Sequence, residues 1–189
     1  MSHPLHILGI SGSLRSQSTN SLLLASLKHV LPSTVSFSIY NGLESLPHFN
    51  PELEEPTPPA TVVAFRKELA AADAVVFCTP EYAFGLPGAL KDGLDWIVSS
   101  GEFTNKPVVL ISASPLATGG EKALVSLETT IKVMGAKIPD GGTIAIPFIV
   151  KKIDKQGIIT DKETAERLQQ LMDVLIEFIP ENKRTLEEM

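Results

Sequence analysis

The chain has 189 residues, of which 43% are hydrophobic and 20% are charged, a composition that suits a single globular domain with a full core. Its net charge of −6 argues against nucleic acid as the main partner, because phosphate backbones are bound by basic surfaces. No apolar run approaches the ~20 residues of a membrane span, and the first residues lack the pattern of a signal peptide. The single cysteine, Cys78, excludes an internal disulfide and fits a reducing compartment, so a cytoplasmic protein is expected.

Strand-like apolar runs alternate with helix-like segments along the chain. The expected strands cover residues 5–10, 35–40, 74–78, 108–111 and about 142–146. The expected helices cover residues 18–31, 60–71, 89–98, 121–134 and 161–179, the last with Thr160 and Asp161 as its cap. The runs at 74–78 and 108–111 are continuously apolar, which is typical of central parallel strands buried on both faces. This order predicts an α/β fold, a doubly wound parallel sheet of about five strands.

Two segments do not fit this alternation. Residues 41–59 contain five prolines and four glutamates, so a long irregular loop is expected there. Such a loop is either an interface or lid, or a plain surface connection, and the sequence leaves both interpretations open. Residues 181–189 are expected to form a solvated tail of a single domain that spans residues 1–189.

A small, hydroxyl-rich turn, residues 9–20, joins the first expected strand to the first expected helix. Backbone N–H groups at the start of a helix have no intrahelical partner, and the helix dipole adds about half a positive charge there. Hydroxyl groups can donate to phosphate oxygens, and Arg15 can bind a phosphate in bidentate fashion. The turn therefore indicates a phosphate-bearing ligand, although a serine-rich turn before a helix is often only an N-cap.

Two further loops follow the central strands, at residues 79–91 and 112–120. The first contains two prolines and two glycines within nine residues, and the second consists mainly of small residues that lead into a helix. Because the carboxyl ends of parallel strands meet at one edge of a sheet, all three loops are expected to border one pocket. A phosphate end, an apolar middle and a wall of free N–H donors suit a mononucleotide with a flat ring.

The motifs of these loops resemble a known family. Gly12-Ser13-Leu14-Arg15 with Ser18 and Asn20, and the segment from Pro80-Glu81-Tyr82 to Lys91 with Asp95 and Trp96, are similar to the flavodoxin-like NAD(P)H-dependent FMN reductases. That family includes quinone, azo-dye and chromate reductases, and the resemblance covers roughly residues 5 to 150. It implies a flavodoxin-like three-layer α/β/α fold, non-covalently bound FMN, NADPH or NADH as hydride donor, and quinone-like small-molecule acceptors. It also implies a homodimer or homotetramer with the site near a subunit interface.

The resemblance further implies which residues bind the cofactor. The FMN phosphate would be held by Ser13, Arg15, Ser18, Thr19 and Asn20. The isoalloxazine would be lined by Pro80, Glu81, Tyr82 and Ala83, mostly through backbone groups, with Phe84 as an apolar wall for nicotinamide or substrate. The third loop would contribute Ser114, Gly119 and Gly120, with the N–H groups of the two glycines facing the flavin atoms N1 and O2. Many relatives have Asn after Pro-Glu-Tyr, where this chain has Ala83.

Hydride transfer between nicotinamide and flavin is the chemistry of the cofactors, so no catalytic side chain is expected. The four histidines lack metal-ligand spacing, and no metal site is predicted. A structural role is favoured for Glu81 over that of a general acid. Cys78 is expected to be a small core residue, and Lys91 and Asp95 to form an i,i+4 pair.

The leading hypothesis is an oxidoreductase that transfers hydride from NAD(P)H through FMN to quinones or similar acceptors, in ping-pong order. One alternative is a flavodoxin-type carrier, which binds FMN and passes single electrons to partner proteins without turning over NAD(P)H. Another is a regulatory module that has kept the fold and lost the flavin. A dinucleotide-binding Rossmann domain is disfavoured, because the G-x-G-x-x-G motif is absent.

Overall fold

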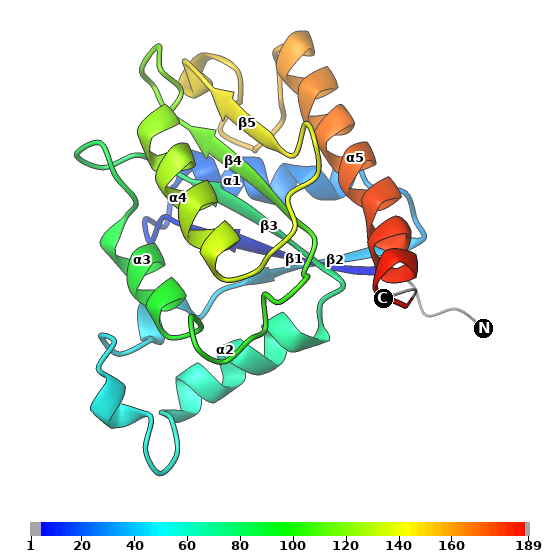
Figure 1. Ribbon diagram of the computed structural model, residues 1–189. Coiled ribbons are helices and arrows are strands. Elements are labelled where there is room, and N and C mark those ends of the chain that lie inside the picture. The colour runs from blue at the N-terminus through cyan, green and yellow to red at the C-terminus, as the bar shows by residue number, and fades with distance from the viewer. Residues whose placement is uncertain (1–4, 188–189) are drawn as a thin grey trace.

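The computed structural model describes residues 5–187 and shows five strands in one parallel sheet (Figure 1). The strands are β1 (Leu5–Ser11), β2 (Val35–Tyr40), β3 (Ala74–Thr79), β4 (Val108–Ala113) and β5 (Thr143–Ile146). They lie in the order β2-β1-β3-β4-β5, and each neighbouring pair is parallel. This is the strand order of flavodoxin-like folds, so the predicted fold class is confirmed.

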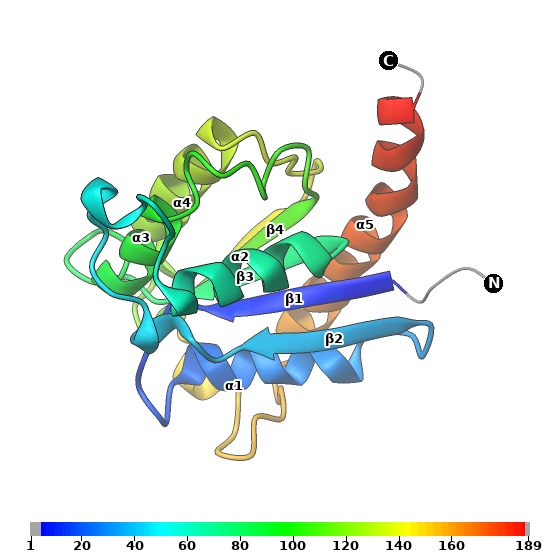
Figure 2. The ribbon, with the colours of Figure 1, turned by 90° about the horizontal axis from the view of Figure 1, so that it is seen from below.

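Helices cover both faces of the sheet, as Figures 1 and 2 show. They are α1 (Thr19–Ser26), α2 (Ala60–Ala71), α3 (Gly88–Asp95), α4 (Glu121–Val133) and α5 (Lys162–Glu187). Buried side chains of α1 and α5 pack against one face, and those of α2, α3 and α4 pack against the other. Every residue of β3 and β4 is buried, because alternate side chains enter opposite cores, and this explains their continuously apolar sequences.

Three helices end differently from the prediction. The helix α1 stops at Ser26 and continues as a 3-10 turn, Leu27–His29, and α3 stops at Asp95. The helix α5 continues past Pro180 to Glu187, so most of the expected tail is helical, and residues 188–189 lie outside the described part. This extension contacts a residue that is distant in the sequence, because Asn182 Nδ2 donates to the carbonyl of Asn105 at 2.8 Å. Among the described helices, none combines the length and apolar character needed to cross a bilayer.

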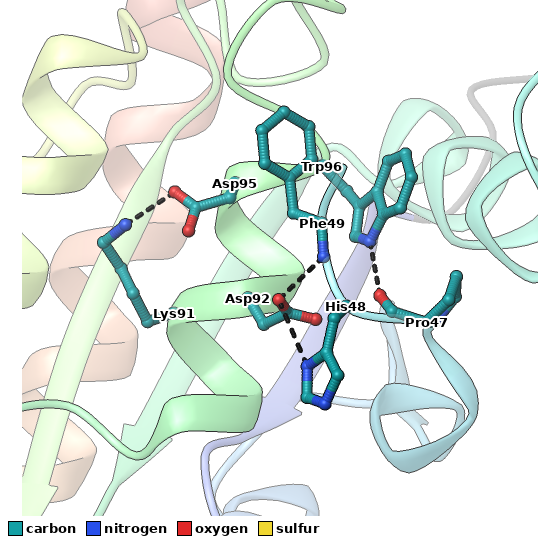
Figure 3. A network of polar contacts seen from close by, with 7 residues as sticks. All are labelled: Pro47, His48, Phe49, Lys91, Asp92, Asp95 and Trp96. Atoms are coloured by element: carbon teal, nitrogen blue, oxygen red, sulfur yellow. Dashed lines mark hydrogen bonds and ion pairs between the residues drawn. The ribbon is translucent and has the colours of Figure 1, made fainter. Parts of the chain in front are cut away.

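The proline-rich segment 41–59 is fastened to α3 (Figure 3). The indole Nε1–H of Trp96 donates to the carbonyl of Pro47 at 2.7 Å, and the backbone N–H of Phe49 donates to Asp92 Oδ1 at 2.9 Å. The ring of Phe49 also meets Trp96 edge-on, with centroids 5.1 Å apart. The predicted i,i+4 pair of Lys91 and Asp95 lies on the same helix. These contacts favour a fixed connection over a mobile lid.

Candidate functional site

The loops after β1, β3 and β4 begin side by side at the carboxyl edge of the sheet. Register aligns Ser11 with Cys78 and Thr79 with Ser112, and the N–H of Gly12 donates to the Cys78 carbonyl at 2.9 Å. A Cβ on Gly12 would lie 2.4 Å from Thr79 Oγ1, so only glycine allows the first loop to approach β3 this closely.

A cavity of about 360 Å³ lies between these loops, within the range of small-molecule sites. It is lined by Ser13, Arg15, Ser18, Thr19, Asn20, Pro80, Glu81, Tyr82, Ala113, Ser114, Pro115, Leu116, Ile149 and Val150. Every residue predicted for the phosphate is in this set, together with Pro80, Glu81, Tyr82 and Ser114. Sequence reasoning did not name Ala113, Pro115 and Leu116 of the third loop as site residues, and it missed Ile149 and Val150 altogether. Their position just after β5, at the same edge of the sheet, is the signal that points to them.

The first loop offers several donors to an anion. The hydroxyl oxygen of Ser18 caps α1 by accepting the N–H of Ser21 at 3.4 Å, and Ser13 Oγ accepts the N–H of Arg15 at 3.4 Å. Within residues 5–187, the N–H groups of Gln17 and Thr19 have no hydrogen-bond partner, and the guanidinium of Arg15 makes no ion pair. Free N–H groups at a helix start, next to an unpaired cation, favour a phosphate.

Asn20 connects α1 to the two central strands. Its side chain is buried, with Nδ2 donating to the Ala113 carbonyl at 3.1 Å and Oδ1 accepting the Cys78 thiol at 3.4 Å. Burial raises the pKa of the Cys78 thiol, so the thiol keeps its proton and donates. One of the two N–H groups of Nδ2 is used in the bond to Ala113, so Asn20 can offer a ligand the other one together with its backbone N–H.

Glu81 links the second loop to the third. Its carboxylate accepts the backbone N–H groups of Lys122 at 2.8 Å and Ala123 at 3.1 Å, both in the first turn of α4. The residue before that helix is Gly120, which has no side chain to cap it. Glu81 therefore serves as a remote N-cap, a structural role that it performs through its side chain.

Ala83 and Phe84 form the tip of a tight turn beside the cavity. Tyr82 and Gly85 exchange backbone hydrogen bonds of 3.1 and 3.0 Å, and the two residues between them have φ values of 50° and 62°. Left-handed backbone costs a residue with a Cβ about 1–2 kcal/mol, so this turn is strained. Phe84 is 80% exposed. Ala83 does not line the cavity, unlike what was expected, and the role of Phe84 as an apolar wall for nicotinamide or substrate stays a prediction.

The two glycines of the third loop are buried behind the cavity wall. Gly119 has φ of 63°, and a Cβ there would lie 2.9 Å from the backbone nitrogen of Ile146. Its N–H donates to the Leu116 carbonyl at 3.2 Å, so it is not available as the donor that was predicted. Gly120 does not line the cavity either, but its N–H has no partner within the described residues. Both glycines allow this loop to pass close to its neighbours.

The chain is similar to known proteins over most of its length. The sequence model of the NADPH-dependent FMN reductase family matches residues 5–151. An NAD(P)H-dependent FMN reductase of Pseudomonas aeruginosa is 32% identical over 177 residues, covering 93% of this chain and 95% of the relative. A quinone reductase of Escherichia coli K12 is 27% identical over 183 residues, covering 95% and 97%. Among solved structures, the flavoenzyme NAD(P)H:(acceptor) oxidoreductase of Paracoccus denitrificans has a TM-score of 0.82 at 26% identity, covering 94% of this chain and 98% of that one.

Proposed function

The chain belongs to the NADPH-dependent FMN reductase family, and on this basis we propose that it binds FMN between the three loops and reduces quinone-like acceptors with NADPH or NADH. One observation carries this proposal: Thr19, with its N–H unpaired within the described residues, and Arg15, with its guanidinium likewise unpaired, line a cavity whose other walls include the second and third loops. The donor set fits FMN, because N–H groups, hydroxyls and a guanidinium match its phosphate and the second loop offers backbone groups to its ring.

At the phosphate end, Ser13, Ser18 and Thr19 would donate through hydroxyl or backbone N–H groups, and Asn20 would donate through its backbone or the second N–H of its amide. Arg15 would pair with the phosphate from the exposed side of the cavity. Apart from the exposed Arg15, these groups are held in place before binding, because the cap of α1 and the amide of Asn20 fix the turn. Their role is to anchor the cofactor rather than to take part in chemistry.

At the ring end, Pro80, Glu81 and Tyr82 would line one side and Ser114 the other. FMN held by these residues would supply the hydride-transfer chemistry between the nicotinamide and the acceptor. The overall reaction is NAD(P)H plus a proton plus a quinone, giving NAD(P)+ and a quinol. Glu81 holds the second and third loops together at this end. Exposed Tyr82, Phe84 and Leu116 give the opening an apolar border that suits flat rings.

We expect a ping-pong order, because the donor and the acceptor would occupy the same apolar border in turn. Initial velocities measured at several fixed quinone concentrations should give parallel double-reciprocal lines against NADPH. Lines that converge would show that both substrates are bound at once and would contradict the shared position. A carrier without NAD(P)H turnover would give no steady-state rate at all.

We also propose a cytoplasmic homodimer or homotetramer. The segment 41–59 and the adjoining end of α3 carry exposed apolar side chains, namely Phe49, Leu53 and Val98, which a second copy would cover. Light scattering coupled to size exclusion tests this assembly, and Leu53→Glu should lower the measured mass. A wild-type mass equal to that of one chain would contradict it.

A further inference from the structure

A second cavity, of about 530 Å³, adjoins the proposed flavin site. It is lined by Ser16, Gln17, Thr19, Leu22, Val150, Ile153, Asp154 and Lys155. Thr19 and Val150 also line the first cavity, so the two spaces meet across these residues. One wall is the start of α1, and the other is the segment between β5 and α5, which Figure 2 shows beside α1 in yellow to orange. The proposed flavin site leaves this space unused.

A well-defined hairpin forms the second wall. Asp154 and Ile158 are joined by a backbone hydrogen bond of 2.9 Å, and the N–H of Gly157 donates to the Asp154 carbonyl at 3.1 Å. The carboxylate of Asp154 accepts the N–H groups of Gln156 and Ile158, each at 2.9 Å. Gly157 supplies the left-handed φ of 84° that closes such a turn. Lys155 is therefore carried at the tip of an ordered turn.

The charges around this cavity leave one cation unpaired. Lys155 makes no ion pair or hydrogen bond within residues 5–187, whereas neighbouring Lys152 lies 3.6 Å from Asp161. Lys151 stands over the ring of Phe148, 5.7 Å from its centroid. Asp154 is the acidic residue of the lining, and its carboxylate already accepts two backbone N–H groups. In a chain of net charge −6, the cavity thus has a free ammonium at its outer end.

We propose that this second cavity receives the adenosine end of the nicotinamide dinucleotide, with Lys155 paired to the 2′-phosphate of NADPH. This inference rests on the proposed function, because a dinucleotide whose adenosine lies beside the phosphate end, at Thr19 and Val150, must still place its nicotinamide over the flavin ring at the other end of the first cavity. Leu22 and Ile153 offer apolar surface to the adenine, and Ser16 and Gln17 offer polar groups to the ribose. NADH lacks the phosphate, so Lys155 determines a preference for NADPH.

Binding of fragments by the FMN-loaded protein tests the site without catalysis. In calorimetry, adenosine 2′,5′-bisphosphate should bind about tenfold more tightly than adenosine 5′-monophosphate, since only the former carries the 2′-phosphate. Lys155→Ala should remove this difference. Lys137→Ala is the matched control, because Lys137 is exposed and lies next to the opposite end of β4. Equal affinities in the wild type, or an undiminished difference in Lys155→Ala, would overturn the proposal.

Flavin reduction by the two donors separates this inference from the function on which it rests. In rapid mixing, Lys155→Ala should lower the second-order rate constant for NADPH about tenfold and leave that for NADH unchanged. Reduction by both donors with the wild-type ratio in Lys155→Ala would overturn the assignment of Lys155 and leave the proposed function intact. No reduction of the wild type by either donor would overturn the proposed function, and the donor assignment with it.

Discussion

The carboxylate of Glu81 accepts the backbone N–H of Lys122 at 2.8 Å, across 41 residues of chain, and thereby caps α4 from the loop after β3. Replacing a capping side chain by alanine costs about 1 kcal/mol, so Glu81→Ala should lower the free energy of unfolding by that amount. FMN binding should weaken as well, because two walls of the cavity lose their connection. Glu81→Gln keeps an acceptor oxygen, so it should lose less stability and less FMN affinity than Glu81→Ala. Denaturant unfolding and FMN titration measure these effects, and an Ala variant as stable as wild type would contradict the capping role.

Arg15 is the cation predicted to govern FMN affinity. A charge-assisted hydrogen bond contributes about 1.5–3 kcal/mol, and because Arg15 is exposed we expect the lower end, about a tenfold weaker Kd for Arg15→Ala. Activity should return to the wild-type level in excess FMN. Arg15→Lys keeps the charge without the planar fork and should be intermediate. Full FMN occupancy with lost activity in Arg15→Ala would contradict a purely anchoring role.

Because the turn at Ala83 is strained, replacing alanine by glycine should change the free energy of unfolding in opposite directions at Ala83 and at Ala64. Ala83 has φ of 50°, so Ala83→Gly relieves left-handed strain and should raise the free energy of unfolding by about 1 kcal/mol. Ala64 lies in the interior of α2, where the same change should lower it by about 1 kcal/mol. Denaturant unfolding of both variants measures the difference. Equal destabilisation would show that the turn carries no strain.

The carboxylate of Asp161 should make the stability of the protein depend on pH in the acidic range. Hydrogen bonds from the hydroxyl and N–H of Thr164, together with the charge of Lys152, hold the pKa of Asp161 below its usual 3.8. Its contribution is therefore present above the unfolded pKa of about 3.9 and is lost as pH falls through the lower folded pKa. Wild type should have a higher Tm than Asp161→Asn at pH 7, and the difference should shrink below about pH 4.

The control for this effect is Asp140→Asn, since Asp140 is exposed and makes no hydrogen bond within the described chain. Its Tm should follow that of wild type from neutral to acidic pH. A gap between wild type and Asp161→Asn that stays constant down to the lowest pH would mean that the charge of Asp161 is not what stabilises the start of α5.

The sheet could be predicted from the sequence because its signal is local. Continuous apolar runs gave β3 and β4 within one or two residues, and the start of α5 followed from Asp161, whose carboxylate accepts the Thr164 N–H at 3.0 Å. The cofactor-binding loops were located by their motifs and by the rule that parallel strands end at one edge. These features depend on residues that are near one another in the chain.

The details that could not be predicted depend on contacts between distant segments. The amide of Asn20 donates to a carbonyl 93 residues away, and Glu81 caps a helix 41 residues away. No local sequence pattern predicts either hydrogen bond. The place of Ile149 and Val150 after β5 could be predicted, but the hydrogen bond of 3.1 Å from the N–H of Ile149 to the Ser114 carbonyl, which joins them to the third loop, could not. The extension of α5 past Pro180 likewise relies on Asn182 contacting Asn105.

The central claim is that the cavity between the three loops holds an FMN that NAD(P)H reduces. The direct measurement is the visible absorbance of the purified protein with one equivalent of FMN, recorded before and after anaerobic addition of NADPH. The account predicts a flavin that stays with the protein through gel filtration, bleaches on addition of the donor, and regains its colour when a quinone is added. A protein that retains no FMN, or a bound flavin that stays oxidised with both NADPH and NADH, would contradict it.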